Sequence, residues 1–193
     1  MMKNRYIGIF GLMGSGKSVV INEFMFQNKD IQFLDFDAPP VDARFRGMPF
    51  TFIDDIFAIE KNKIKINFFE LDAPTINQWK EFIQVCEGII LVYNFEKDEY
   101  FENHLVFINN ILEYSKKDVI IGIIINNCNN LNEGISKMNI FFDNPIFENR
   151  LYRIINLETA ETKYIDKLGK RVYIDTTMLK NLFYGIIDEI LDK

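Results

Sequence analysis

The chain has 193 residues and a formal net charge of −6, and 48% of its residues are hydrophobic. This length and this apolar content are typical of one domain with a substantial core. Nucleic-acid-binding domains carry clustered basic residues, whereas the lysines and arginines of this acidic chain are scattered, so no nucleic-acid partner is expected.

Three further features concern the compartment. The only two cysteines, Cys86 and Cys128, lack metal-ligand spacing and suit a reducing cytosol. The longest apolar runs, 88–93 and 119–125, are too short to span a bilayer. Position 2 is methionine and the last residues contain no cysteine, so neither a myristoyl nor a prenyl anchor is encoded. The sequence therefore predicts a cytoplasmic protein without a direct membrane anchor.

Predicted strands and helices alternate along the chain. The apolar run 6–10 predicts a buried strand, and a helical segment follows at 19–26. The polar stretch 28–49 contains Pro39-Pro40, which excludes a helix there. The remaining predicted elements are strands at 51–60 and 63–71, a helix at 75–85, a strand at 88–93, a helix at 99–114, a strand at 119–125, a helix at 157–168, a strand at 171–174 and a helix at 178–191.

This alternation predicts an α/β fold with three layers, in which a mostly parallel six-stranded sheet has helices on both faces. A hairpin turn at 61–62 would give that sheet one antiparallel edge strand. The whole chain, 1–193, is expected to form one domain. Two segments, 31–47 and 132–156, look like insertions, and both a partner-binding surface and a packed lid remain open for them.

The segment Gly11–Ser18 matches G-x-x-x-x-G-K-[ST], the phosphate-binding P-loop, and lies between the first predicted strand and helix. Its glycines let backbone amides curl around a polyphosphate, and the following helix adds the positive end of its dipole. Lys17 would reach the outer phosphates, and the Ser18 hydroxyl would hold Mg²⁺. The predicted nucleotide contacts in this loop are Met13, Gly14, Ser15, Gly16, Lys17, Ser18 and Val19.

With the P-loop in place, the order of elements and the strings 68–75 and 173–178 resemble the Ras-like small GTPases over nearly the whole chain. The resemblance implies a GTP/GDP switch with Mg²⁺ as cofactor. It implies that Asp72, in a D-x-x-G-like string, orients the ion through water, and that Thr51 ligates it together with Ser18.

The same resemblance implies further contacts. Thr75 would meet the γ-phosphate, and Thr177 and Met178 would lie in the base-binding loop before the last helix. Regulatory or effector proteins would bind the switch regions around Thr51 and Thr75, which order when a γ-phosphate is present.

At three positions the chain differs from the family pattern in a way that is expected to slow hydrolysis. Thr75 stands at the glycine of D-x-x-G, and Ile76 stands where the family has its catalytic glutamine. Met13 would crowd the attacking water and an incoming arginine finger. Weak or absent intrinsic hydrolysis is expected, as in a pseudo-GTPase. Gln78, out of register, is the catalytic candidate that remains.

The base-recognition motif N-K-x-D also differs, because the chain has Asn126-Asn127-Cys128-Asn129. Asn126, Asn127 and Asn129 are the predicted base contacts. An asparagine lacks the carboxylate that pairs with guanine, which costs about 1–3 kcal/mol of discrimination and leaves guanine specificity open. A capped turn without base contact is an equal alternative for this loop.

A P-loop small-molecule kinase that uses ATP is the alternative function. The string 33–37 with Arg44 and Arg46 looks like the acceptor region of dephospho-CoA or nucleoside kinases, and Arg150 and Arg153 would then be lid residues. The predicted hairpin, the strand end at Asp72 and the loop before the last helix favour the GTPase-like interpretation.

Overall fold

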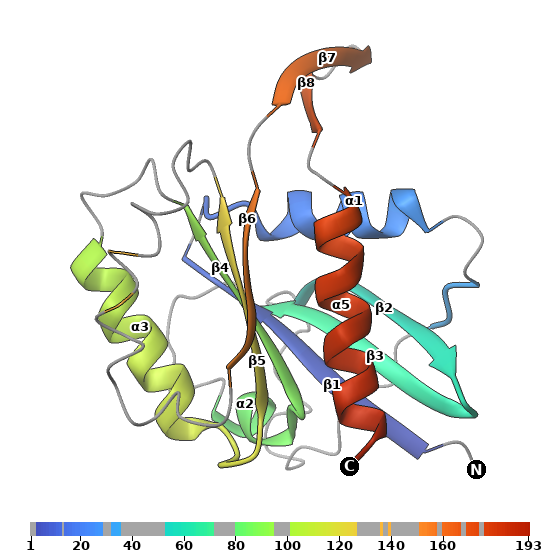
Figure 1. The fold of residues 1–193 in the computed structure, drawn as a ribbon, viewed down its shortest axis with the longest axis vertical. Helices are drawn as coiled ribbons and strands as arrows, with labels where there is room; N and C mark the ends of the chain where they lie inside the picture. Colours follow the sequence, from blue (N-terminus) through green and yellow to red (C-terminus); the bar gives the residue numbers. More distant parts are fainter. Residues whose placement is uncertain are drawn as a thin grey trace.

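The computed structural model describes residues 3–12, 14–28, 32–35, 53–71, 80–94, 101–126, 136, 139, 151–157, 160–166, 169–173 and 176–193. Strands and helices alternate over most of the chain, as the sequence predicts (Figure 1). The elements are β1 (Lys3–Phe10), α1 (Lys17–Gln27), β2 (Ile53–Lys61), β3 (Ile64–Leu71), α2 (Lys80–Val85), β4 (Gly88–Asn94), α3 (Phe101–Tyr114), β5 (Ile120–Asn126), β6 (Leu151–Leu157), β7 (Ala160–Asp166), β8 (Gly169–Tyr173) and α5 (Thr176–Leu191).

The main sheet has six strands in the order β2-β3-β1-β4-β5-β6. Every neighbouring pair is parallel except β2 and β3, which form an antiparallel hairpin. Asn62 and Lys63 connect these two strands with φ angles of 55° and 62°. Positive φ at both central residues is the geometry of a tight hairpin turn whose twist matches the strands. The expected α/β fold with one antiparallel edge strand is confirmed.

The sheet separates two apolar layers, because successive side chains of a strand point to opposite faces. On β4, Ile89 and Leu91 pack with residues of α2 and α3, while Ile90 and Val92 pack with residues of α1 and α5. The same alternation holds along β1, β3 and β5. Helices therefore cover both faces of the sheet, and the fold has three layers.

Stacked aromatic rings fix α1 against its neighbours. The rings of Phe24 in α1 and Phe183 in α5 stack with centroids 4.2 Å apart. Phe57 of β2 stacks on Phe68 of β3 at 4.5 Å, and Phe68 also lies beside Phe24. Such aromatic pairs contribute about 0.5–1.5 kcal/mol each beyond their buried area. This packing holds α1 against α5 and against the β2–β3 end of the sheet.

The helix predicted at 157–168 is wrong. β6 ends at Leu157, and residues 160–166 form β7, which pairs antiparallel with β8 in a separate two-stranded sheet. This small sheet projects beyond the end of the main sheet (Figure 1). Thr162, Tyr164 and Ile165 are β-branched or aromatic residues, which fit a pleated strand better than a helix.

The sixth strand of the main sheet also differs from expectation. The segment predicted as that strand, 171–174, contributes residues to β8 instead. β6 takes its place by pairing parallel with β5, so residues 151–156 of the predicted insertion at 132–156 belong to the core sheet. An apolar strand such as Leu151–Leu157 is driven to the open edge of β5, where its backbone groups find partners.

Of the segment predicted as the first insertion, residues 32–35 are described. Leu34 and Ala58 of β2 exchange both backbone hydrogen bonds, with N···O distances of 2.7 and 3.1 Å. This part of the segment is therefore anchored to the edge strand of the sheet. Among the described residues, no helix is long and apolar enough to cross a membrane.

Candidate phosphate-binding site

The carboxyl ends of the parallel strands meet at one edge of the sheet, and the loop between β1 and α1 lies there. The register pairs Phe10 with Leu71 of β3 and with Leu91 of β4, and pairs Asn94 with Asn126 at the ends of β4 and β5. In open α/β sheets, ligands bind outside the carboxyl ends of the strands. The glycine-rich loop thus occupies the edge at which a ligand is expected.

Two glycines give the loop its shape. Gly14 has a φ of 76°, and Gly16, which precedes the first residue of α1, has φ 96° and ψ 18°. These left-handed conformations strain any residue with a Cβ atom. No side chain of the N-cap residue bonds to the first turn of α1, since that residue is glycine. The amides and the positive dipole end of this helix can therefore serve an anion.

Lys17 is buried beneath the loop. Its side chain is only 3% exposed, and its Nζ donates to the carbonyl oxygens of Gly11 at 3.0 Å and Leu12 at 3.3 Å. These carbonyls belong to the first residues of the same loop, so the lysine is folded back along it. A buried ammonium needs partners, because an unpaired charge in the interior is costly.

The third partner of Lys17 is Glu70, near the end of β3. Glu70 Oε1 lies 3.5 Å from Lys17 Nζ, and the Glu70 side chain is likewise 3% exposed. Its other oxygen, Oε2, accepts a hydrogen bond of 3.0 Å from Ser18 Oγ. One buried carboxylate thus contacts both Lys17 and Ser18, for which the sequence predicts phosphate and Mg²⁺ binding.

Sequence reasoning did not single out Glu70. The signal was present, because an acid stands in the apolar strand Ile64–Leu71 at the same parity as Ile66 and Phe68, which pack with α1 and α5. A carboxylate on a core-facing position needs a cationic or hydrogen-bonding partner. Lys17 and Ser18 are those partners.

Two asparagines hold the loop from the ends of neighbouring strands. Asn94 Nδ2 of β4 donates to the carbonyl oxygen of Gly14 at 3.0 Å. Asn126 Nδ2 of β5 donates to the carbonyl oxygen of Ser15 at 3.1 Å. Both carbonyls are thereby held toward the sheet. The base contact predicted for Asn126 stays a prediction, and in this structure its amide group supports the loop. Asn94 was not anticipated.

The Ser15 side chain supplies a further polar group. Ser15 is 1% exposed, and its hydroxyl oxygen has no hydrogen-bond partner among the described residues. A buried hydroxyl of this kind usually has a partner, so it fits a bound ligand oxygen nearby. Together with Lys17 and the uncapped start of α1, it matches what a polyphosphate requires.

The oxygen atoms of Ser18 and Glu70 fit Mg²⁺, which prefers oxygen ligands and is usually bound through one or two carboxylates, retained waters and phosphates. Among the described residues there is no group of three or more His, Cys, Asp or Glu side chains that could hold a metal.

The contacts given above do not include several other residues that were predicted to lie in the site. Thr177 and Met178 lie exposed in the first turn of α5, which packs beside α1, and Val19 is exposed in the first turn of α1. Their nucleotide contacts stay predictions. The residues that lie outside the described part of the chain are Met13, Thr51, Asp72, Thr75, Gln78, Asn127 and Asn129.

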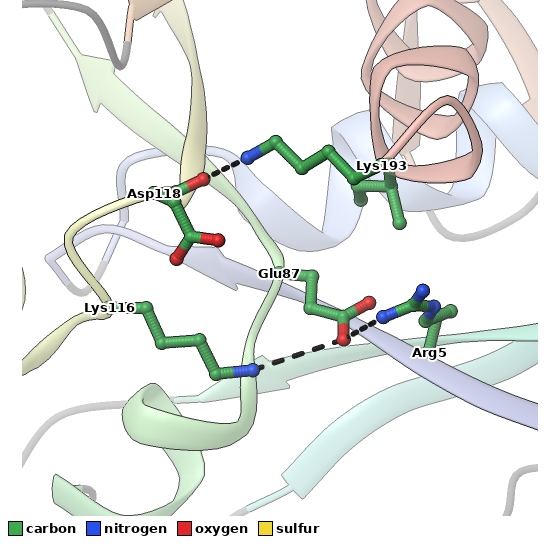
Figure 2. Close-up of a pocket in the computed structure, with 6 residues that line it drawn as sticks. Arg5, Glu87, Lys116, Asp118 and Lys193 are labelled. Atoms are coloured by element: carbon green, nitrogen blue, oxygen red, sulfur yellow. Dashed lines mark hydrogen bonds and ion pairs between the residues drawn. The ribbon is translucent and has the colours of Figure 1, made fainter.

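A second polar cluster lies at the opposite end of the sheet, before the starts of β4 and β5 (Figure 2). Arg5 forms an ion pair with Glu87 Oε1, and Lys116 Nζ lies 3.9 Å from the same oxygen. Lys193 Nζ donates to the backbone carbonyl of Asp118. These groups line a cavity of about 200 Å³, in which Glu87 pairs with Arg5 and Lys116. The features that suit a polyphosphate belong to the loop at the other end.

No protein-family model and no curated protein sequence matches the chain. The assignment of a site therefore rests on the sequence motif and on the geometry described above.

Proposed function

We propose that this protein binds a Mg²⁺-nucleotide through the β1–α1 loop and acts as a GTP/GDP switch of the small-GTPase kind, with weak or absent intrinsic hydrolysis. The observation that carries the proposal is the buried Lys17, held within the glycine-rich loop at 3.0 Å from the Gly11 carbonyl. A lysine at this position has its ammonium group beside the edge where a phosphate tail would lie.

Different residues of the described part of the chain would bind the phosphates and the Mg²⁺ ion. Gly14 and Gly16 shape the loop, and Lys17 and the first amides of α1 hold the phosphates. Ser18 would hold Mg²⁺, which when bound neutralises phosphate charge. Asn94 and Asn126 keep the loop carbonyls turned to the sheet, so that amides rather than carbonyls face an anion.

The antiparallel β2–β3 hairpin supports the switch over the kinase alternative, since a hairpin at this edge was the feature expected of the GTPase-like order. Arg153, a lid residue in the kinase interpretation, lies within β6 and pairs with Gly122 of β5. The backbone of Arg153 is thus fixed in an edge strand of the main sheet rather than in a separate lid segment.

The rest of the proposal is carried by sequence alone. Weak hydrolysis is proposed because Met13 would crowd the attacking water, Thr75 stands at the glycine of D-x-x-G, and Ile76 cannot orient water as the family's glutamine does. Recognition of guanine and binding of regulatory or effector proteins are likewise proposed from the resemblance. Binding of the phosphate tail requires none of these features and is therefore tested first.

The test is titration calorimetry of nucleotide-stripped protein with GTP, GDP and ATP in Mg²⁺, with phosphate release followed in parallel. Lys17→Ala should weaken binding by more than about tenfold, because a charge-assisted contact contributes roughly 1.5–3 kcal/mol. Lys116→Ala, at the opposite end of the sheet, is the control and should bind as the wild type does.

Urea unfolding accompanies each titration, since removing Lys17 takes away the buried ammonium 3.5 Å from Glu70. Unchanged affinity in a folded Lys17→Ala variant would refute the phosphate site. Binding of ATP without any response to GTP would replace the switch with the kinase alternative.

A further inference from the structure

We propose that Glu70, rather than Asp72, is the carboxylate that organises the Mg²⁺ site of this protein. The inference rests on the proposed nucleotide binding and deepens it by assigning the acid. The family resemblance places that acid at Asp72, two residues further along the chain, whereas the structure brings Glu70 to the P-loop.

Glu70 contacts Ser18 directly. A serine hydroxyl has one proton and two lone pairs, and here the proton is donated to Glu70 Oε2 at 3.0 Å. The lone pairs of Ser18 Oγ are then left for a cation. Glu70 thus acts as a positioning residue, which fixes the orientation of the hydroxyl that ligates the ion.

Glu70 also places a negative charge beside Lys17 and Ser18. Glu70 and Lys17 are both 3% exposed and lie 3.5 Å apart, so the carboxylate forms an ion pair with the ammonium in a poorly solvated place. A negative charge adjacent to Ser18 favours a divalent cation there. It also weakens the pull of Lys17 on a phosphate when no metal is present. Glu70 should therefore make nucleotide binding depend on Mg²⁺.

Glu70 also has a fixed position on the sheet. It lies within β3, paired with Ile9 of β1, one residue before the end of both strands. A carboxylate on a central strand is held more rigidly than one on a loop, and rigid placement is what a site for Mg²⁺, with its strict octahedral geometry, requires.

The experiment measures the affinity of the stripped protein for GDP and ADP, each in excess Mg²⁺ and in EDTA, and the affinity of the nucleotide complex for Mn²⁺ by electron paramagnetic resonance. Glu70→Gln keeps the size of the side chain and removes its charge. It should lower both the Mg²⁺ enhancement and the Mn²⁺ affinity by about 10–100-fold, the usual effect of losing an outer-shell partner. Binding in EDTA should be retained or become tighter.

Two variants serve as comparisons. Glu87→Gln removes a glutamate that also pairs with basic side chains, at the far end of the sheet, and should leave the Mg²⁺ enhancement unchanged. Asp72→Asn tests the rival assignment and should keep most of the enhancement.

The outcomes separate cleanly. A folded Glu70→Gln variant whose affinity falls equally with and without Mg²⁺ would make Glu70 a purely structural partner of Lys17 and overturn the proposal. Loss of the enhancement in Asp72→Asn would overturn it as well, and this arm decides the matter if Glu70→Gln does not fold. If the wild type binds neither nucleotide, the proposed function itself fails, and the assignment falls with it.

Discussion

Gly16→Ala is the substitution that most directly tests the geometry of the loop. Gly16 has a φ of 96°, and a left-handed conformation costs a residue with a Cβ atom about 1–2 kcal/mol. The added methyl would also lie 2.3 Å from Asn126 Nδ2, well inside contact distance, so the Asn126 side chain must move. Its hydrogen bond to the Ser15 carbonyl, worth about 1 kcal/mol, would then be lost. The expected total is a loss of about 2–3 kcal/mol of unfolding free energy.

A double-mutant cycle separates the two contributions. Asn126→Ala by itself removes the hydrogen bond and should cost about 1–2 kcal/mol, since it leaves a buried carbonyl without its donor. In the double variant the bond is lost only once, so the combined cost should fall about 1 kcal/mol below the sum of the single costs. Urea unfolding of the nucleotide-free protein, followed by far-ultraviolet circular dichroism, provides the free energies.

Gly14→Ala is the control for this cycle. Gly14 has a φ of 76°, so the substitution is strained in the same way, but its carbonyl is held by Asn94 rather than Asn126. Its combination with Asn126→Ala should be additive within about 0.5 kcal/mol. Additive costs for the Gly16 and Asn126 pair would refute the contact, and a Gly16→Ala variant as stable as the wild type would refute the left-handed start of α1.

Two further predictions concern the core. Phe24→Ala removes the ring stacked on Phe183 and should cost about 3–5 kcal/mol in the same urea assay; a loss below about 1 kcal/mol would mean that this cluster does not hold α1 in place. Burial raises the pKa of the Cys86 thiol, so the unfolded chain releases that proton first as pH rises past about 8.5. Above that pH, the unfolding free energy of the wild type should therefore fall more steeply than that of Cys86→Ala, by up to about 1.4 kcal/mol per pH unit. Equal slopes for the two proteins would contradict the burial of the thiol.

The sequence alone predicts the elements in which local pattern and structure agree. The apolar runs in β1, β4 and β5 are buried on both faces, which is why they lack alternation and predict buried strands. The β2–β3 hairpin and the helix after the glycine-rich loop also follow from short-range signals. These elements are specified by neighbours within a few residues, and the P-loop motif is a contiguous string.

The sequence pattern does not predict the elements that the structure has between residues 151 and 173. There the chain forms β6, β7 and β8 in place of a predicted helix and a single strand. Whether a short segment with mixed polarity becomes a helix or a strand depends on which partner it meets. β5 offers an open edge to β6, and β7 and β8 satisfy each other's backbone groups.

In the candidate site, too, some features follow from the local sequence and others follow only from the tertiary structure. The sequence determined that Lys17 and Ser18 follow a glycine-rich turn after a buried strand, because the motif is local. Only the tertiary structure decided which side chains support them. The contacts of Glu70 with Ser18, of Asn94 with Gly14 and of Asn126 with Ser15 span 52, 80 and 111 residues of chain. They arise because the register of the parallel strands brings their carboxyl ends to one edge, and no local pattern encodes that register.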